Sequence, residues 1–282
     1  MTVLVTGGAG YIGSHMVLAL RDRGERVVVL DNLSTGFAWA VPPDVPFFGG
    51  DVADQALVKR LIGEQGVSAI CHFAAKIVVP DSVADPLGYY AGNTMASRNL
   101  LEAAVQSGVR HFIFSSTAAT YGEPEVMPVS EDTPQVPVSP YGRSKLMTEW
   151  MLEDTSRAHD FRYVALRYFN VAGADPFGRT GQSTPNATHL IKAASQAVIG
   201  LRTHLDLYGT DYATPDGTCV RDYIQVSDLA AAHVLALDYL RAGGASTVYN
   251  CGYGKGFSVR EVIDTVKRGR GVDFKVTVLG CR

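Results

Sequence analysis

Three glycines near the start of the chain constrain the fold more than any other feature of the sequence. Gly7, Gly10 and Gly13 stand at a G-x-x-G-x-x-G spacing, directly after an apolar run at residues 3–5. The run predicts a short buried strand of a parallel sheet, and the residues after the glycines show helical spacing. Glycines between such a strand and helix let the backbone turn sharply and approach a phosphate at the helix N-terminus. The alternative is a glycine-rich loop that only connects the two elements.

A second strand and an acidic residue follow in the order that a dinucleotide site requires. Residues 27–30 predict the strand, and Asp31 ends it. A carboxylate at this position accepts hydrogen bonds from the adenosine ribose hydroxyls and repels a 2′-phosphate. We therefore expect a bound dinucleotide, NAD rather than NADP, and disfavour the reading of the glycines as a simple connection.

Strands and helices alternate through the first two thirds of the chain. We expect strands at 67–74, 110–116 and 163–168, and helices at 93–107 and 140–159. This alternation predicts an α/β fold, a Rossmann-type doubly wound parallel sheet with helices on both faces.

After residue 170 the pattern loosens, which predicts a smaller C-terminal substrate lobe. Residues 175–186 are rich in Gly, Pro, Thr and Ser and predict a loop that crosses to it. Helices are expected at 227–241 and 258–267, and strands at 248–250 and 274–279. The expected NAD-binding domain spans 1–170, with about 216–245 packing back on it, and the substrate lobe spans 171–215 and 246–282. The substrate is expected between the lobes, beyond the carboxyl ends of the strands.

Composition excludes several classes of partner. The chain carries 25 basic and 28 acidic residues, so we expect no nucleic-acid partner. No apolar run reaches the length of a membrane span, so no membrane partner is expected either. A strand at residues 2–5 leaves no room for a signal or transit peptide. Four cysteines without metal-ligand spacing predict reduced thiols, no bound metal and a cytoplasmic protein: Cys71, Cys219, Cys251 and Cys281.

A tyrosine and a lysine supply an acid/base group that can work beside the cofactor. Ser139 and Pro140 predict the start of a helix, and Tyr141 and Lys145 project from one face of it. An ammonium beside a phenol, together with the positive nicotinamide, lowers the tyrosine pKa and makes Tyr141 a usable base. Lys145 can also bind the nicotinamide ribose. The alternative is a surface tyrosine and lysine on an ordinary helix.

Three hydroxyl residues end the strand expected at 110–116. Ser115, Ser116 and Thr117 lie where open α/β sheets place their chemistry. A hydroxyl there can bind the reacting substrate oxygen and relay its proton to Tyr141. We expect Thr117 to have this role, with Ser116 as the second choice. The alternative is that these hydroxyls cap the local backbone.

Nearly the whole chain resembles the extended short-chain dehydrogenase/reductase family, and within it the NAD-dependent nucleotide-sugar 4-epimerases. The last three of the matching segments are more specific than the glycine loop. The segments are TGGAGYIGSH at 6–15, DNLSTG at 31–36, GDV at 50–52, FAAK at 73–76, Asn93, FSSTAATYG at 114–122, SPYGRSK at 139–145, LRYFNVAGA at 166–174 and DGTCVRDYI at 216–224.

The resemblance implies an extended cofactor site. Asp51 and Val52 would bind the adenine, Lys76 would approach the phosphates, and Asn93 would lie on the cofactor side. The residues expected at NAD are Gly7, Gly10, Tyr11, Ile12, Gly13, Asp31, Asn32, Asp51, Val52, Phe73, Ala74, Ala75, Lys76, Asn93, Ser115, Tyr141, Lys145 and Tyr168.

The resemblance also implies a site for a UDP-sugar. Tyr168 and Phe169 would line the sugar and nicotinamide region, and Asn170 would hold the diphosphate. A guanidinium matches phosphate geometry, which suits Arg221. The residues expected at the substrate are Thr117, Tyr141, Phe169, Asn170, His189, Leu190, Leu207, Tyr208, Arg221 and Tyr223.

The implied reaction interconverts UDP-galactose and UDP-glucose through a 4-keto intermediate. Tyr141 takes the 4-hydroxyl proton while C4 gives hydride to NAD⁺, the keto sugar turns over, and hydride returns to its other face. The catalytic residues would be Tyr141, Lys145 and Thr117. The resemblance further implies a homodimer.

The sequence departs from the family pattern in three places. Thr117 stands where serine is usual, and Cys219 replaces a usual glycine near the nucleotide. Relatives typically continue past Arg282 with an Arg-x-Gly-Asp-like segment and a gate residue beside the sugar, so we expect a truncated substrate lobe.

Three alternative functions remain open at this point. The first is epimerisation of UDP-glucuronate, UDP-xylose or a UDP-N-acetylhexosamine. The second is a non-catalytic NAD-binding protein. The third, a nucleotide-sugar 4,6-dehydratase, is disfavoured because Ala118 and Ala119 stand where that chemistry needs an Asp-Glu pair.

Overall fold

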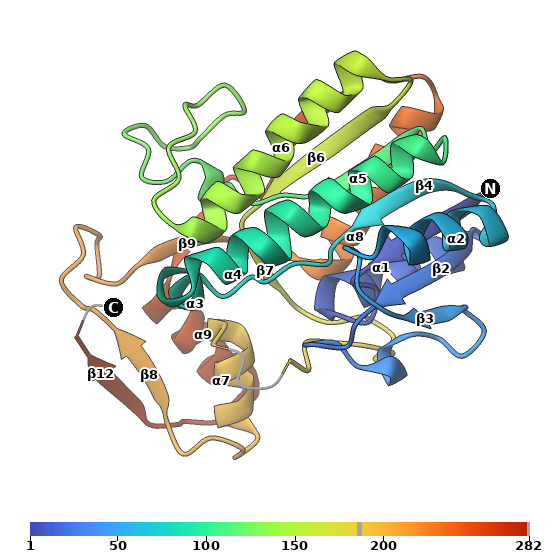
Figure 1. The fold of residues 1–282 in the computed structure, drawn as a ribbon. Helices are drawn as coiled ribbons and strands as arrows, with labels where there is room; N and C mark the ends of the chain where they lie inside the picture. Colours follow the sequence, from blue (N-terminus) through green and yellow to red (C-terminus); the bar gives the residue numbers. More distant parts are fainter. Residues whose placement is uncertain (185–187, 281–282) are drawn as a thin grey trace.

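The computed structural model of the chain describes residues 1–184 and 188–280, and its largest element is a seven-stranded parallel sheet (Figure 1). The strand order is β10-β6-β5-β4-β1-β2-β3. The order reverses at β1, which pairs with β2 on one side and with β4 on the other. This arrangement confirms the expected Rossmann-type doubly wound sheet. The strands are β1 (Thr2–Thr6), β2 (Arg26–Asp31), β3 (Phe47–Gly49), β4 (Val67–His72), β5 (His111–Ser115), β6 (Arg162–Tyr168) and β10 (Thr247–Cys251).

Helices cover both faces of this sheet because its strands are apolar on both sides. In β1, Val3 and Val5 pack into one core while Leu4 packs into the other, as the alternation of side chains along a strand requires. The helices α1 (Tyr11–Asp22) and α8 (Val226–Arg241) supply the first core. The second core is supplied by α2 (Gln55–Gln65), α5 (Ala96–Gln106) and α6 (Pro140–Ala158), which lie in front of the sheet in Figure 1.

Short helical segments join these layers. The expected helix at 93–107 is divided, because a π-helical turn, η2 (Tyr90–Met95), precedes α5. The others are η1 (Ala38–Ala40), α3 (Val79–Ala84), α4 (Pro86–Tyr89) and η3 (Ala118–Thr120).

Most of the later part of the chain forms a smaller lobe with its own apolar core. One sheet joins β7 (Asn170–Ala172), β9 (Val220–Gln225) and β11 (Gly256–Ser258), and another joins β8 (Leu205–Tyr208) and β12 (Val276–Leu279). The helices are α7 (Leu190–Val198) and α9 (Val259–Arg270), which lie beside β8 and β12 in Figure 1. Their core includes Ala194, Leu205, Leu207 and Ile263.

The strand β10 lies outside the place that the sequence predicts for it. The expected division assigned residues 246–282 to the smaller lobe, whereas β10 forms the edge of the large sheet beside β6. The reason is that α8 crosses back over the large sheet, and Val248 and Cys251 then pack against its two cores. The smaller lobe therefore resumes after Cys251.

Across residues 1–184 and 188–280, no helix has both the length and the apolar character needed to cross a membrane. The same residues contain no grouping of three His, Cys, Asp or Glu side chains that could hold a metal ion.

Candidate active site

The glycine loop between β1 and α1 is built on close backbone contacts. Gly7 has a φ of +70°, and its N–H donates to the Leu30 carbonyl oxygen at 2.9 Å. A Cβ on Gly13 would lie 2.1 Å from the Gly7 carbonyl oxygen, so only glycine allows this turn. The nearest atom to a Cβ on Gly10 would be the Gly7 carbonyl oxygen at 3.2 Å, so this Cβ would occupy the space over the loop. No side chain of the described chain caps α1 at Gly10, so its first N–H groups suit a pyrophosphate.

Asp31 ties the end of β2 to this loop. Its Oδ2 atom accepts a hydrogen bond from the Ala9 N–H at 2.9 Å, and its Oδ1 atom accepts one from the Leu33 N–H at 2.7 Å. Leu33 has a positive φ of 57°. Asn32 is exposed beside it and accepts a bond from the Ser34 N–H at 3.0 Å. The buried carboxylate is thus held next to the loop, where a ribose hydroxyl can share it and a 2′-phosphate would be repelled.

Further residues expected at the cofactor follow β3 and β4, with Asp51 and Val52 expected at the adenine. Asp51 is exposed, and its Oδ1 atom accepts from the Ala53 N–H at 2.8 Å. Val52 is buried in the large core, so its backbone is the part left to face a ligand. The segment Phe73 to Ala75 follows β4, and a Cβ on Gly7 would lie 2.6 Å from the Ala74 nitrogen. The fold therefore brings this segment against the glycine loop.

Asn93 fastens the segment after β4 to helix α6. Its Oδ1 atom accepts from the Lys76 N–H at 2.8 Å, while its Nδ2 atom donates to the Lys76 carbonyl at 3.0 Å and to Ser144 Oγ at 3.0 Å. The Lys76 ammonium is exposed and lies 3.9 Å from Asp85 Oδ2. Asn93 is thus a buried support of the cofactor side, and a contact of Lys76 with phosphates stays a prediction.

The fold brings Tyr141 and Thr117 together at the carboxyl end of β5. Ser139 caps α6 by accepting from the Gly142 N–H at 3.1 Å, which places Tyr141 in the first turn. Thr117 faces the Tyr141 phenol as a side-chain hydrogen-bond partner. Thr117 Oγ1 also accepts from the Ala119 N–H at 3.1 Å, so the capping alternative and the catalytic one share the same hydroxyl. Ser116 points elsewhere, toward Glu149.

Burial dominates the electrostatics of the tyrosine and the lysine. It raises the pKa of Tyr141 to about 12, against which the Thr117 hydroxyl lowers it. Burial lowers the pKa of Lys145 to about 7, while the charge of Glu149 raises it. Lys145 Nζ donates to the Ser115 carbonyl oxygen at 2.9 Å and lies 4.9 Å from the Phe114 ring centre. The lysine is thus fixed to the strand end, and the support of its charge for the phenolate of Tyr141 stays a prediction.

Tyr168 and a histidine that the sequence-based site does not include lie beside the residues expected at the cofactor. Tyr168 ends β6, shares a hydrogen bond with Ser115 Oγ, and has a pKa raised by burial. His233 of α8 is fully buried, with its ring 4.8 Å from that of Phe73 and 6.2 Å from that of Tyr168. Burial lowers the pKa of His233 to about 4. A single histidine in an apolar helix gives no sequence signal of such a position.

Part of the expected substrate set is brought together by sheet register. Phe169 links β6 to β7, and Asn170 pairs directly with Tyr223 across β7 and β9. Arg221 lies two residues earlier on β9, so its side chain is on the same side of the strand as that of Tyr223. Arg221 is exposed, and its Nη1 atom donates to the Val220 carbonyl at 2.8 Å. A polar amide, a guanidinium and an aromatic ring therefore share one sheet beyond β6.

The remaining expected residues lie on the smaller lobe. His189 is exposed at the start of α7 and bonds Gln182 at 2.9 Å, and Tyr208 is half-buried at the end of β8. Leu190 and Leu207 belong to the apolar core of that lobe. Leu207 is only 3 % exposed, so its backbone is the part available to a nucleotide, and its place in the substrate site stays a prediction.

Together the loop, Asp31 and the Tyr141–Lys145 pair at the carboxyl edge of a parallel sheet define a dinucleotide-binding protein of the doubly wound class. Residues 3–252 match the NAD dependent epimerase/dehydratase family. The chain therefore belongs to this family.

Three similar proteins illustrate the match. The chain is 58 % identical over 275 residues to the UDP-glucose 4-epimerase of Azospirillum brasilense, an alignment that covers 98 % of this chain and 79 % of the relative. The crystal structure of UDP-glucose 4-epimerase from Brucella ovis in complex with NAD superposes with a TM-score of 0.95 at 45 % identity, covering 100 % of this chain and 86 % of that one. The enzyme from Bifidobacterium longum in complex with NAD⁺ and UDP has a TM-score of 0.94 at 37 % identity and covers 100 % and 87 %.

Proposed function

We propose that the chain is an NAD-dependent epimerase that interconverts UDP-galactose and UDP-glucose by inverting C4 of the sugar. The observation that carries the proposal is the meeting of Tyr141 with Thr117 at the carboxyl end of β5, next to the Ser115 carbonyl that holds Lys145. The high identity to UDP-glucose 4-epimerases over nearly the whole chain supports the same substrate.

The residues of the chain supply the proton transfer and the positioning. Tyr141 removes the proton of the 4-hydroxyl and returns it after the sugar has turned over, which is the work of a general base and acid. Thr117 hydrogen-bonds the same oxygen and steers it toward the phenol. The glycine loop and Asp31 would hold NAD, which would supply the acceptor and donor of the hydride of C4. The high pKa of Tyr141 in its buried place requires a nearby positive charge, which Lys145 and the cofactor both provide.

Recognition of the nucleotide is assigned to the β7–β9 sheet. Arg221 would pair with the diphosphate, Asn170 would donate its amide to it, and Tyr223 would pack against the sugar or the base. Asn170 follows directly after Tyr168 and Phe169, and β9 with Arg221 and Tyr223 pairs with its strand. A diphosphate bound to these groups would therefore leave the sugar at Tyr141. The pairing of a guanidinium with phosphate is strong and directional.

The proposal includes a homodimer in a reducing compartment, the cytoplasm. The segments α4, η2 and α6 expose Leu87, Met95 and Trp150, and exposed apolar side chains of this size favour an interface. Three described cysteines, Cys71, Cys219 and Cys251, are free thiols, as a reducing compartment favours. Light scattering should report about twice the chain mass of 30.2 kDa, and a single-chain mass at micromolar concentration would remove the dimer from the proposal.

The test is the product formed from UDP-galactose by the purified, NAD-loaded protein. UDP-glucose should appear, and Tyr141→Phe should lower turnover by roughly 10²–10⁴-fold with NAD content unchanged. Tyr239→Phe, at a partly exposed tyrosine of α8, is the matched control and should keep full activity. If the protein turned over only another UDP-sugar, the proposed substrate would be wrong and the enzyme class would stand. The absence of turnover with every UDP-sugar, in a protein that holds NAD, would reduce the chain to a non-catalytic NAD-binding protein.

A further inference from the structure

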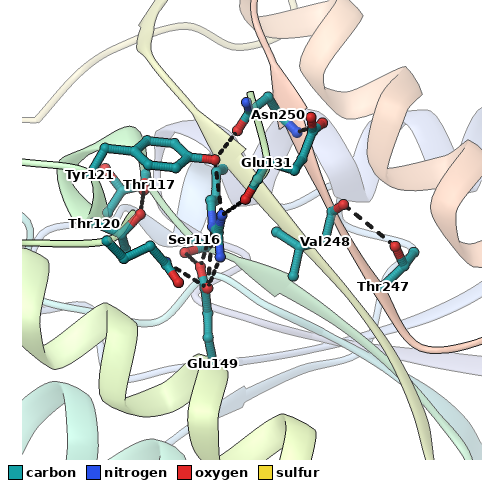
Figure 2. A network of polar contacts seen from close by, with 11 residues as sticks. Ser116, Thr117, Thr120, Tyr121, Glu131, Glu149, Thr247, Val248 and Asn250 are labelled. Carbon is teal, nitrogen blue, oxygen red and sulfur yellow. Dashed lines mark hydrogen bonds and ion pairs between the residues drawn. The ribbon is translucent and has the colours of Figure 1, made fainter. Parts of the chain in front are cut away.

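A buried carboxylate stands on the same helix face as the proposed catalytic pair. Tyr141, Lys145 and Glu149 follow one another at intervals of four residues along α6, so their side chains form one row. Glu149 is 5 % exposed, and so is its ion-pair partner Arg167 of β6. Figure 2 shows Glu149 within a network of polar contacts that includes Ser116.

Every oxygen of the Glu149 carboxylate is occupied. Arg167 Nε donates to both oxygens at 3.1 and 3.2 Å, and its Nη2 atom donates to Oε2 at 2.6 Å. The Ser116 hydroxyl donates to Oε1, and Gln135 Nε2 donates to Oε2 at 3.2 Å. A buried charge so fully bonded is held in one geometry.

Arg167 connects Glu149 to a second set of polar groups, which includes Tyr121. Its Nη1 atom donates to the Tyr121 hydroxyl at 2.9 Å and to the Glu131 carbonyl at 3.3 Å. Tyr121 in turn donates to Asn250 Oδ1 at 2.7 Å, which reaches β10. Figure 2 shows the Tyr121 ring directed toward Asn250, with Glu131 beside Asn250.

Helix α6 therefore forms hydrogen bonds with two successive residues at the end of β5. Lys145 donates to the carbonyl of Ser115, and Glu149 accepts from the hydroxyl of Ser116. The next residue is Thr117, which faces Tyr141. We propose that Glu149, locked by Arg167, is a positioning residue that fixes the loop bearing Thr117 against Tyr141 and sets a negative charge one helical turn from the Lys145 ammonium.

The charges around Lys145 support the second part of this role. Burial lowers the pKa of Lys145, and the charge of Glu149 opposes this by raising it. The other titratable or charged groups near the two residues include His72 of β4, Tyr163, Arg167 and Tyr168 of β6, Tyr121 after η3, and Tyr141. Lys145 and burial both keep His72 neutral by lowering its pKa to about 3, so the histidine adds no charge of its own.

A purely structural ion pair would behave differently. Replacing both members of a buried pair with uncharged residues of similar volume is often neutral for stability. If the pair served only stability, a folded protein without it would keep its rate. If Glu149 positions Thr117 and supports Lys145, the folded protein would still turn over slowly, because small misplacements of reacting groups cost up to about 10²-fold.

The experiment rests on the proposed epimerase function and uses the NAD-loaded full chain. The double variant Glu149→Gln/Arg167→Met removes both charges of the ion pair, so neither partner is left buried and unpaired. Its matched control is Glu153→Gln/Arg157→Met, an exposed ion pair one turn further along α6. Each protein is examined by thermal melting, NAD content, the pH dependence of kcat for UDP-galactose, and the near-ultraviolet titration of the Tyr141 phenolate against Tyr141→Phe.

We expect the double variant to fold and hold NAD, with kcat reduced about ten- to a hundred-fold and KM nearly unchanged. The alkaline limb of its kcat profile should move to lower pH, because Lys145 loses its proton more easily without Glu149. For the same reason the phenolate of Tyr141 should form at higher pH, by about one unit. The control should match the wild type in all four measurements.

The outcomes separate the two proposals. A folded double variant with wild-type kcat and an unmoved phenolate titration would overturn the role of Glu149. If the wild type itself shows no epimerisation, the proposed function fails, and the phenolate titration still decides the role of Glu149. Should the double variant not fold, Ser116→Ala removes only the hydroxyl that Glu149 holds: a reduced kcat with an unmoved alkaline limb supports the anchoring role, and a wild-type kcat overturns it.

Discussion

The Lys145 ammonium donates a hydrogen bond of 2.9 Å to the carbonyl oxygen of Ser115. Ser115 is the last residue of β5 and directly precedes Ser116 and Thr117. The lysine therefore belongs to the strand end as much as to its own helix. This position explains how a 3 % exposed cation stays in place, since the carbonyl dipole and the Phe114 ring both face it. It also puts a positive charge where both the Tyr141 phenolate and a nicotinamide ribose can use it.

Replacing this lysine should remove activity while the fold persists. Lys145→Met keeps the length of the buried stem and removes the ammonium. We expect kcat to fall roughly 10²–10⁴-fold, since the base Tyr141 loses its supporting charge. Steady-state kinetics at several pH values measure this effect, with Lys275→Met at an exposed lysine as the control. Turnover of the variant within a factor of about two of the wild type would contradict the assigned role.

The cofactor preference should depend on Asp31. Its carboxylate holds the Ala9 N–H and stands where a 2′-phosphate would fall. Nucleotide released from the denatured wild type should be mainly NAD. Asp31→Ala should bind NAD about ten- to a hundred-fold more weakly, because losing a charged hydrogen-bond partner costs about 1.5–3 kcal/mol.

The control for Asp31 is Asp44→Asn, at an exposed carboxylate paired with Arg21. This substitution should leave the nucleotide content unchanged. Recovery of mainly NADP from the wild type, or undiminished NAD binding by Asp31→Ala, would show that the carboxylate does not select the cofactor.

Features that depend on local spacing could be predicted from the sequence. The glycine loop, Asp31 and the Tyr141–Lys145 helix face follow from residues within a few positions of one another, and the parallel sheet follows from their alternation. The partnership of Glu149 with Arg167 could not, because only the packing of α6 on β6 brings the two charges together. The burial of the Leu207 side chain could not be predicted for a related reason, since it is set by partners far along the chain.

The pH dependence of stability should carry a contribution from His233. Burial lowers its pKa in the folded chain to about 4, whereas an unfolded histidine titrates near about 6.5. Between these values the unfolded chain binds more protons, so stability is complete above about 6.5 and is lost as the pH falls toward about 4. One such group gives a slope of up to about 1.4 kcal/mol per pH unit.

The measurement is urea unfolding of His233→Met and the wild type across this range. The variant should lose less stability on acidification, although His72 gives both proteins a further loss in the same direction. His159→Gln, at an exposed histidine after α6, is the control and should follow the wild type. Equal slopes for His233→Met and the wild type would mean that His233 is not buried as a neutral ring.

Two glycines in helices should respond in opposite directions to alanine. A Cβ on Gly13 would lie 2.1 Å from the Gly7 carbonyl oxygen, so Gly13→Ala must push α1 away from the loop. Overpacking of this kind costs typically about 1–3 kcal/mol, and it displaces the N–H groups that would face the pyrophosphate. Gly63 lies exposed in α2 with nothing within 4 Å of its ideal Cβ. Gly63→Ala should therefore stabilise the protein by about 0.5–1 kcal/mol.

Thermal melting and NAD content of the two variants separate packing from binding. Gly13→Ala should melt at lower temperature and lose bound NAD, while Gly63→Ala should melt at higher temperature and keep it. Because the two substitutions add the same methyl group to a helix, the difference between them isolates the contact with Gly7. If Gly13→Ala retained both the melting temperature and the NAD content of the wild type, the close approach of α1 to the loop would not be what the cofactor site requires.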